Sequence, residues 1–178
     1  MLIFLDGQDR VGKDSLIDQL RKHMKSPLFQ VFHEGKPPAD VDHRKWAIEH
    51  YDFMLRNAAN SRHSSVSIYN RSHIGEVVWG PKYRGYNADF IFDLERQYLS
   101  YIEDSYLILL TDSSDRLMSR DDGKSLTKST TELDDVRGAF SMAFDKSCIR
   151  NKLHVKLEDV AFDDVCQTVW SFLHANSE

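Results

Sequence analysis

The sequence predicts an α/β fold in which a five-stranded parallel sheet carries helices on both faces. Short apolar segments typical of buried strands alternate with longer segments whose apolar residues recur at helical spacing. Strands that alternate with such helices form parallel sheets covered on both sides. A glycine-containing loop, residues 7–13, joins the first apolar segment to the first helical segment. Because ligands of such sheets bind beyond the carboxyl ends of the strands, we expect the functional site at that edge.

The expected strands are short and rich in β-branched and aromatic residues, and they cover residues 1–6, 29–32, 66–69, 106–110 and 153–157. The paired prolines Pro37 and Pro38 exclude a regular ladder after the second strand, since proline has no N–H to donate. Helices are expected between the strands, over residues 13–24, 43–60, 90–98, 129–144 and 165–173. Ser129 and Glu132 have the spacing of a capping box at the start of the fourth of these helices.

The length and composition are those of a single small globular domain. The chain has 178 residues, 41% of them hydrophobic, so a single domain over residues 1–178 is expected. No apolar run is long enough to cross a membrane, and the apolar start has no basic lead, which together predict a cytoplasmic protein. Cys148 and Cys166 form no C-x-x-C pair, so neither a disulfide framework nor a zinc site is indicated. A net charge of −5 argues against a long nucleic acid as partner but allows a small anionic ligand.

The strongest motif lies directly after the first strand. Residues 7–13 have the G-x-x-x-x-G-K spacing of a phosphate loop, or P-loop, in its proper context between a strand and a helix. Backbone N–H groups of such a loop converge on phosphate oxygens, and the lysine reaches the β and γ phosphates of ATP. The expected ATP-binding residues of the loop and helix start are Gly7, Gln8, Asp9, Arg10, Val11, Gly12, Lys13, Asp14 and Ser15.

Asp14 departs from this motif. It stands where a Ser or Thr normally offers its hydroxyl to Mg²⁺. Ser15 cannot take over that role, because one residue further along a helix lies about 100° around the axis, where it would face an α phosphate. Asp14 could bind Mg²⁺ or its water through the carboxylate. It could equally be a helix-terminal aspartate that interacts only with the dipole.

The loop resembles that of the thymidylate kinase family of nucleoside monophosphate kinases. Asp9-Arg10 gives the form G-x-D-R-x-G-K, similar to the subgroup that carries a catalytic arginine in this loop. The resemblance implies that Asp9 contacts the sugar hydroxyl of the acceptor and that Arg10 stabilises the transferred phosphoryl group. A guanidinium is suited to the second role because it offsets the charge that spreads over the γ phosphate. The stretch Gly-Lys-Asp-Ser that ends the motif resembles bacteriophage deoxynucleotide kinases.

A second group of residues follows the third strand and therefore lies at the same sheet edge. Tyr69-Asn70-Arg71 resembles the Asp-Arg motif of thymidylate kinases, which implies that Arg71 grips the acceptor phosphate. The planar fork of arginine suits that role, and a structural ion pair is the alternative. Asn70 replaces the family's aspartate, so we expect Asp14 and Asn70 to converge on one Mg²⁺, with the carboxylate moved across it. Glu76 is a weaker candidate for that carboxylate, because its helix could equally point it to solvent.

The rest of the expected site comes from loops. Aromatic residues after the second group could form a flat wall for a base, although each could instead be core packing. The expected acceptor-binding residues are Asp9, Glu34, Lys36, Arg71, Trp79, Tyr83 and Arg84. The polar stretch at about residues 116–129 resembles the family's lid. Arg116 and Arg120, four residues apart, would share a helix face and could reach ATP, or could belong to a solvated helix end.

These features predict an enzyme that uses ATP and Mg²⁺ to phosphorylate a deoxynucleoside monophosphate, with dTMP or a related, even modified, pyrimidine as the leading substrate. Its catalytic residues would be Lys13, Arg10, Arg71 and Asp9. The alternatives are a kinase acting on a modified base in DNA, a catalytically impaired nucleotide-binding module, and a GTP switch, although residues 151–154 lack the aspartate of a guanine-binding motif. The resemblance suggests a phage origin, with the host cytoplasm as location. The sequence leaves a homodimer open.

Overall fold

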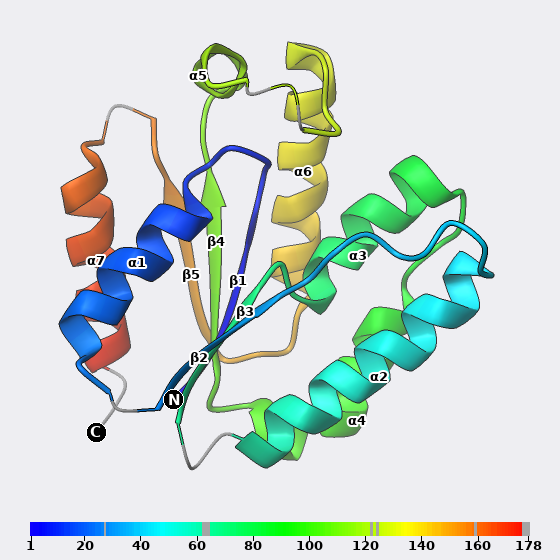
Figure 1. The fold of residues 1–178 in the computed structure, drawn as a ribbon, viewed down its shortest axis with the longest axis horizontal. Helices are drawn as coiled ribbons and strands as arrows, with labels where there is room; N and C mark the ends of the chain where they lie inside the picture. The colour runs from blue at the N-terminus through cyan, green and yellow to red at the C-terminus, as the bar shows by residue number, and fades with distance from the viewer. Residues whose placement is uncertain (27, 62–64, 122, 124, 159, 176–178) are drawn as a thin grey trace.

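A parallel sheet forms the centre of the molecule (Figure 1). The computed structural model describes residues 1–26, 28–61, 65–121, 123, 125–158 and 160–175. The strands are β1 (Leu2–Gly7), β2 (Phe29–His33), β3 (Val66–Asn70), β4 (Tyr106–Thr111) and β5 (Asn151–Lys156). They lie in the order β2-β3-β1-β4-β5, and each neighbouring pair is parallel. The predicted five-stranded parallel sheet is confirmed, with β5 beginning at Asn151 rather than Leu153.

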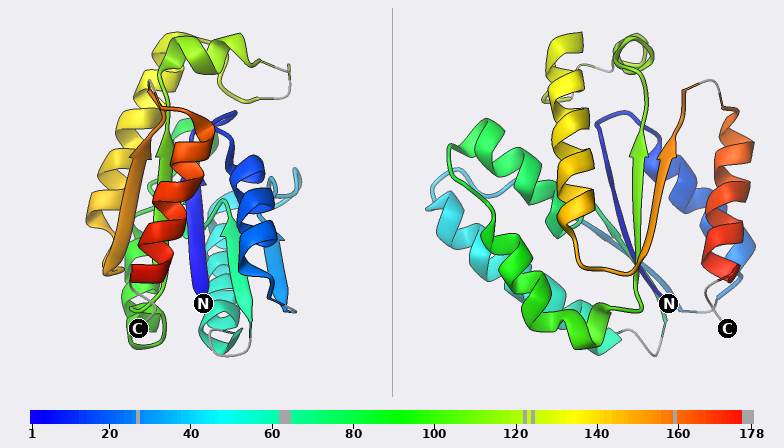
Figure 2. Two further views of the ribbon diagram at one scale, coloured as in Figure 1. Left: turned by 90° about the vertical axis from the view of Figure 1, so that its left-hand side faces the viewer. Right: turned by 180° about the vertical axis from the view of Figure 1, so that it is seen from behind.

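Helices cover both faces of the sheet (Figures 1 and 2). One face carries α1 (Lys13–Met24) and α7 (Phe162–Ala175). The other face carries α2 (His43–Ser61), α3 (His73–Trp79), α4 (Phe90–Ile102) and α6 (Thr130–Lys146). In the edge-on view of Figure 2, the blue helix α1 and the yellow helix α6 lie on opposite sides of the strands. The fold is thus a three-layer α/β arrangement, as the alternating segments predict.

The alternation of side chains along β1 explains why the sheet needs both layers. Leu2 and Phe4 point into the core beneath α2, α3, α4 and α6, whereas Ile3 and Leu5 point into the core beneath α1 and α7. All six residues of β1 are buried. A strand buried on both faces stays apolar throughout, which is why its sequence shows no polar alternation.

Three short elements differ from the prediction. α3 and the π-helix η1 (Gly80–Arg84) divide the stretch after β3, and α5 (Ser114–Ser119) occupies the first part of the expected lid. The helix start at Ser129 is confirmed, because its hydroxyl accepts a hydrogen bond from the N–H of Glu132. The carboxylate of Glu132 accepts from the N–H of Lys128 rather than from Ser129, so the capping box is shifted by one residue. Across the described ranges, no helix has both the length and the hydrophobicity that a membrane crossing would require.

Candidate nucleotide site

The phosphate loop lies between β1 and α1, as the motif predicts. Gly12 is the N-cap of α1 with φ 95°, and Arg10 also has a left-handed backbone with φ 66°. Gly7 has φ 146°, and a Cβ built on it would lie 2.1 Å from the carbonyl oxygen of Leu110 in β4. The loop therefore needs glycine at position 7 because the neighbouring strand occupies the space that a side chain would fill.

Lys13 lies inside this loop. Its ammonium donates hydrogen bonds to the carbonyl oxygens of Gly7 and Gln8, at 2.8 and 2.7 Å. Only 7% of the residue is exposed. Burial, together with the nearby positive charge of Arg71, lowers the pKa of Lys13 to about 8. The loop thus holds a cation whose charge is easily lost in mildly alkaline solution.

This pKa predicts how nucleotide affinity should change with pH. Bound phosphates favour the charged form of Lys13. Above pH 8 the free protein has lost the proton of the Lys13 ammonium, so ATP binding must take up that proton again. The affinity for ATP should therefore be steady near pH 7 and fall by up to about tenfold per pH unit above pH 8. Calorimetric titration between pH 7 and 9.5 measures this. Lys13→Arg, which stays charged, should bind with little pH dependence, and a flat wild-type profile would contradict the assignment.

Gln8 connects the loop to the rest of the fold through its side chain. The amide donates to the carbonyl oxygen of Leu133 at 3.0 Å and accepts from the N–H of Asp112 at 2.9 Å. Its side chain is fully buried, so only its backbone could contact a nucleotide. Val11 is likewise a core residue. These two members of the expected ATP set therefore give the loop its shape rather than side-chain contacts to ATP.

Arg116 and Arg120 share a partner beyond the end of β4. Their guanidinium groups lie 3.5 and 3.2 Å from the carboxylate of Asp112. Arg116 belongs to α5 and also donates to the carbonyl oxygen of Leu157, while Arg120 caps the end of that helix. The N–H of Asp112 donates to the side chain of Gln8, so both arginines are connected to the phosphate loop through Asp112. Neither arginine lines the cavity described below.

Arg10 points into the lid. Its guanidinium donates to the carbonyl oxygens of Leu117 and Thr127, at 3.1 and 2.8 Å, and lies 3.3 Å from Asp121. The side chain is only 6% exposed. We expected this side chain to face the nucleotide; in this structure it binds the lid instead, because the lid offers carbonyls and a carboxylate at the loop's outer side. Of the expected lid, residues 122 and 124 lie outside the described residues.

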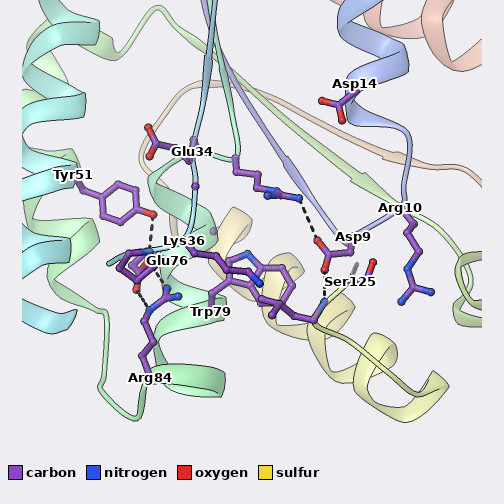
Figure 3. A pocket seen from close by; sticks show the side chains of 16 residues that line it. Asp9, Arg10, Asp14, Glu34, Lys36, Tyr51, Glu76, Trp79, Arg84 and Ser125 are labelled. Carbon is purple, nitrogen blue, oxygen red and sulfur yellow. Dashed lines mark hydrogen bonds and ion pairs between the residues drawn. The ribbon is translucent and has the colours of Figure 1, made fainter. Parts of the chain in front are cut away.

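A cavity of about 370 Å³ opens at the carboxyl ends of β1, β2 and β3 (Figure 3). Six of the seven expected acceptor-binding residues line it: Asp9, Glu34, Lys36, Arg71, Trp79 and Arg84. The seventh, Tyr83, does not line the cavity. Its ring instead stacks on that of Trp79, with centroids 5.8 Å apart and planes 24° apart. Sequence reasoning missed Tyr51, Ser72, Ser125 and Leu126, which also line the cavity.

Arg71 lies at the mouth of this cavity just after β3. It has a left-handed backbone, φ 64°, and its N–H donates to the carbonyl oxygen of Leu5 at 2.9 Å. The guanidinium lies 3.6 Å from the carboxylate of Asp9, and about half of the side chain is exposed. Asp9 also accepts a hydrogen bond from the N–H of Leu126 in the lid, at 3.3 Å. Arg71 is therefore a fixed but accessible cation beside the phosphate loop.

The inner end of the cavity is built around Glu76, for which the sequence offers two alternatives, a carboxylate near the metal or a side chain that points to solvent. The solvent alternative is wrong, because Glu76 is 1% exposed. Its carboxylate accepts from the guanidinium of Arg84 at 2.5 and 3.2 Å and from the hydroxyl of Tyr51 at 3.2 Å (Figure 3). It also accepts from the hydroxyl of Tyr86. Burial, and then the Glu76 carboxylate, raise the pKa of Tyr86 to about 12, so it stays a donor. Glu76 is consequently no metal ligand, and the charge of Arg84 is already neutralised.

Asp6 supports the turn that carries Arg71. It is fully buried in β1, and its carboxylate accepts from the N–H of Ser72 at 3.1 Å and from the Ser72 hydroxyl. Burial raises its pKa to about 6 in spite of these hydrogen bonds. No motif predicts this contact, because it depends on β1 and β3 being neighbours in the sheet.

Asp14 and Asn70 meet, as expected. The amide nitrogen Nδ2 of Asn70 lies 2.6 Å from Oδ1 of Asp14 and 3.1 Å from Nδ1 of His33, the last residue of β2. Asn70 is 5% exposed, and its Oδ1 has no hydrogen-bond partner among the described residues. Nδ2 of Asn70 faces the Asp14 carboxylate here; with the amide turned over, Oδ1 of Asn70 and that carboxylate would be two oxygen donors of the kind that Mg²⁺ prefers.

The parallel sheet, the phosphate loop and the cavity at the strand ends define a P-loop kinase fold. No family model matches the sequence, and no curated protein matches it.

Solved structures match over 98% of this chain. YorR of Bacillus subtilis, in complex with phosphorylated GDP, shares 15% identity over 96% of its length with a TM-score of 0.71. Thymidylate kinase from Candida albicans shares 15% identity over 91% of its length, with a TM-score of 0.59. Deoxyadenosine kinase from M. mycoides, with bound dCTP, shares 12% identity over its whole length, with a TM-score of 0.56. The chain therefore has a thymidylate kinase-like fold.

Proposed function

We propose that this chain is a kinase that moves the γ-phosphoryl group of ATP onto the phosphate of a deoxynucleoside monophosphate, with dTMP or a related pyrimidine as the leading acceptor. One observation carries the proposal: the accessible guanidinium of Arg71 lies at the mouth of a cavity that the phosphate loop borders. The loop would hold the donor and Arg71 would hold the acceptor phosphate between them. The transferred group would leave the β phosphate oxygen of ATP and bond to an oxygen of the acceptor phosphate.

The distribution of charge along the cavity supports a monophosphate acceptor. Cations from Lys13 and Arg71 lie at the end next to the loop. At the other end Arg84 is neutralised by Glu76, Trp79 offers an aromatic wall, and Lys36 also lines the cavity. An anionic phosphate is thus favoured near the loop and an uncharged base near Trp79.

The lid contacts support a role in excluding water. Leu126 binds Asp9, and Thr127 binds Arg10, so two phosphate-loop residues reach into the stretch 120–129. Closure of such a cover over phosphates favours transfer to the acceptor over hydrolysis. If the lid changed position and Arg10 reached the γ phosphate, the same guanidinium would bind the lid in one state and the phosphate in the other.

Mg²⁺ would be held by Asp14 and Asn70. When bound, Mg²⁺ neutralises charge on the β and γ phosphates. In this chain the carboxylate of Asp14 supplies the negative ligand and the carbonyl of Asn70 a neutral one. The contact at 2.6 Å between Asn70 and Asp14, which lines the cavity, supports this assignment.

An assay of ATP consumption with single and competing monophosphates tests the function. We expect turnover with dTMP, competition from dUMP and dCMP, and little turnover with purine monophosphates. Turnover only with GTP as donor, or only with modified DNA as acceptor, would contradict the proposal. Tight ATP binding without turnover for any acceptor would indicate an impaired nucleotide-binding module.

Arg71→Ala should mainly weaken acceptor binding. A hydrogen bond to a charged partner contributes about 1.5–3 kcal/mol, so KM for the acceptor should rise on the order of tenfold or more, with a much smaller change in KM for ATP. Steady-state kinetics with dTMP measure both constants. Arg96→Ala, which removes an exposed arginine of α4 outside the cavity, is the control and should change neither. An unchanged acceptor KM in Arg71→Ala would refute the clamp.

The contact between Asp14 and Asn70 predicts a coupled response to Mg²⁺. Asp14→Ser should weaken Mg²⁺ use, because the site keeps a hydroxyl but loses its carboxylate. Asp14→Ser with Asn70→Asp should recover it by restoring the usual pair. Residues that share a site give coupling of about 0.5–3 kcal/mol. The Mg²⁺ dependence of turnover in all four combinations measures this coupling, and strictly additive effects would leave Asp14 as a helix-terminal charge.

A further inference from the structure

His33 stands beside the proposed metal site because of the sheet register. β2 pairs with β3 so that His33 lies opposite Asn70, the last residue of each strand. Asp14 lies in the first turn of α1 and reaches the same point from the other side. Three residues far apart in the sequence thus present donor atoms to one place, and neither the phosphate-loop motif nor the proposed function uses His33.

The hydrogen bonds at this point show that two electron-pair donors converge. Nδ2 of Asn70 lies 2.6 Å from Oδ1 of Asp14 and 3.1 Å from Nδ1 of His33. Since Nδ2 can only donate, Nδ1 of His33 accepts this hydrogen bond with the ring lone pair that could bind a metal ion. The Asn70 amide nitrogen thus faces two electron-pair donors, the Asp14 carboxylate and the His33 ring.

A third donor is available within Asn70 itself. Its Oδ1 is buried and has no hydrogen-bond partner in the described part of the chain. Rotating the amide by 180° would bring this oxygen to the place of Nδ2 without breaking any hydrogen bond of Oδ1. The rotated group would then face two acceptors, an arrangement that is stable only with a cation between them.

We propose that His33 is a third ligand of the metal ion, with Asp14 and Asn70, and that the site therefore binds transition-metal dications such as Mn²⁺ more tightly than Mg²⁺. The inference rests on the proposed metal site, but not on the identity of the acceptor. Imidazole is a common ligand of transition metals, whereas Mg²⁺ prefers oxygen and tolerates little departure from octahedral geometry.

The distances and exposure fit such a site. Oδ1 of Asp14 and Nδ1 of His33 are 4.0 Å apart. Two ligands on opposite sides of an ion with bonds of about 2.1 Å are about 4.2 Å apart, and adjacent ligands are closer, so one ion can contact both. The side chains of Asp14 and His33 are 82% and 63% exposed, which leaves a path for the ion and room for water or phosphate oxygens as further ligands.

Pulsed electron paramagnetic resonance of bound Mn²⁺ tests this inference directly. The probe is Mn²⁺ with inorganic tripolyphosphate, which contains no nitrogen, so any ¹⁴N coupling must come from the protein. We expect the coupling of a directly bound imidazole in the wild type and in His23→Gln, the control at an exposed histidine near the end of α1. His33→Gln should lose it. A titration of both metals should show Mn²⁺ affinity falling on the order of tenfold in His33→Gln, with a smaller change for Mg²⁺.

The outcomes separate this inference from the proposed function. Nitrogen coupling without turnover for any acceptor would support the His33 ligand while overturning the kinase. Turnover with dTMP but no nitrogen coupling, or coupling that persists in His33→Gln, would overturn the ligand and leave the kinase standing. Failure of Mn²⁺ to bind, or equal loss of both metals in His33→Gln, would also overturn it.

Discussion

Arg10→Ala should lower kcat on the order of a thousandfold while changing the affinity for ATP by less than about tenfold. An arginine that stabilises the transferred phosphoryl group contributes that much in rate, because the charge it offsets is greatest in the transition state. In this structure its guanidinium binds Leu117, Thr127 and Asp121. Single-turnover and steady-state kinetics with saturating ATP and dTMP measure the loss, and binding of ATP is measured separately.

The lid contacts supply the matched control for Arg10. Asp121→Asn removes the negative charge at 3.3 Å but leaves the guanidinium in place. If the ion pair with Asp121 is what makes Arg10 necessary, Asp121→Asn should slow turnover about as much as Arg10→Ala, although the bonds of Arg10 to Leu117 and Thr127 remain. If Arg10 acts on the phosphoryl group, Asp121→Asn should keep turnover within tenfold of the wild type. More than a tenth of wild-type turnover in Arg10→Ala would remove Arg10 from the chemistry.

The parts of the site that sequence reasoning predicted are those encoded in contiguous residues or fixed by the order of parallel strands. The phosphate loop is one stretch between a strand and a helix, so its motif carries its own context. The meeting of Asp14 and Asn70 follows because both lie at the carboxyl edge of neighbouring strands, β1 and β3. That prediction depends on the carboxylate gained at position 14 and lost at position 70, whereas the order that makes β1 and β3 neighbours is seen only in the structure.

The residues that sequence reasoning misplaced depend on contacts between distant segments. The burial of Glu76 cannot be predicted from the sequence, because the sequence does not show that η1 turns the chain back. This turn brings Arg84 and Tyr86 to the Glu76 carboxylate. The close approach of η1 is visible at Gly80, where a Cβ would lie 2.9 Å from Oε1 of Glu76. The contact of His33 with Asn70 likewise depends on the β2–β3 register, which the sequence does not show.

Arg10 illustrates a different limit of the sequence. Its residue type and position suit the phosphoryl group, yet its partners Leu117 and Thr127 lie more than a hundred positions further along the chain. A motif describes the loop in its working state, with ligand present. The motif does not show where a long, flexible side chain lies when hydrogen-bond acceptors other than phosphate are nearer. In this structure the carbonyl oxygens of the lid determine the position of Arg10.

Gly7→Ala should unfold or strongly destabilise the protein, by about 3 kcal/mol or more, although it adds a single methyl group. The new Cβ would lie 2.1 Å from the carbonyl oxygen of Leu110, far inside van der Waals contact, and the clash involves the backbone of β4, a strand inside the sheet, which cannot rotate away. The φ of 146° adds strain for any residue with a side chain. Overpacking alone costs about 1–3 kcal/mol, and an unfavourable backbone conformation adds a similar amount.

Gly138→Ala is the matched control: a Cβ there meets nothing within 4 Å, and the position is exposed within α6, so the same change should stabilise the protein by about 0.5–1 kcal/mol. Urea unfolding of the two variants and the wild type measures both effects. A loss of less than 1 kcal/mol in Gly7→Ala would show that β4 and the loop can move apart, and would contradict the rigid contact on which this account of the phosphate loop depends.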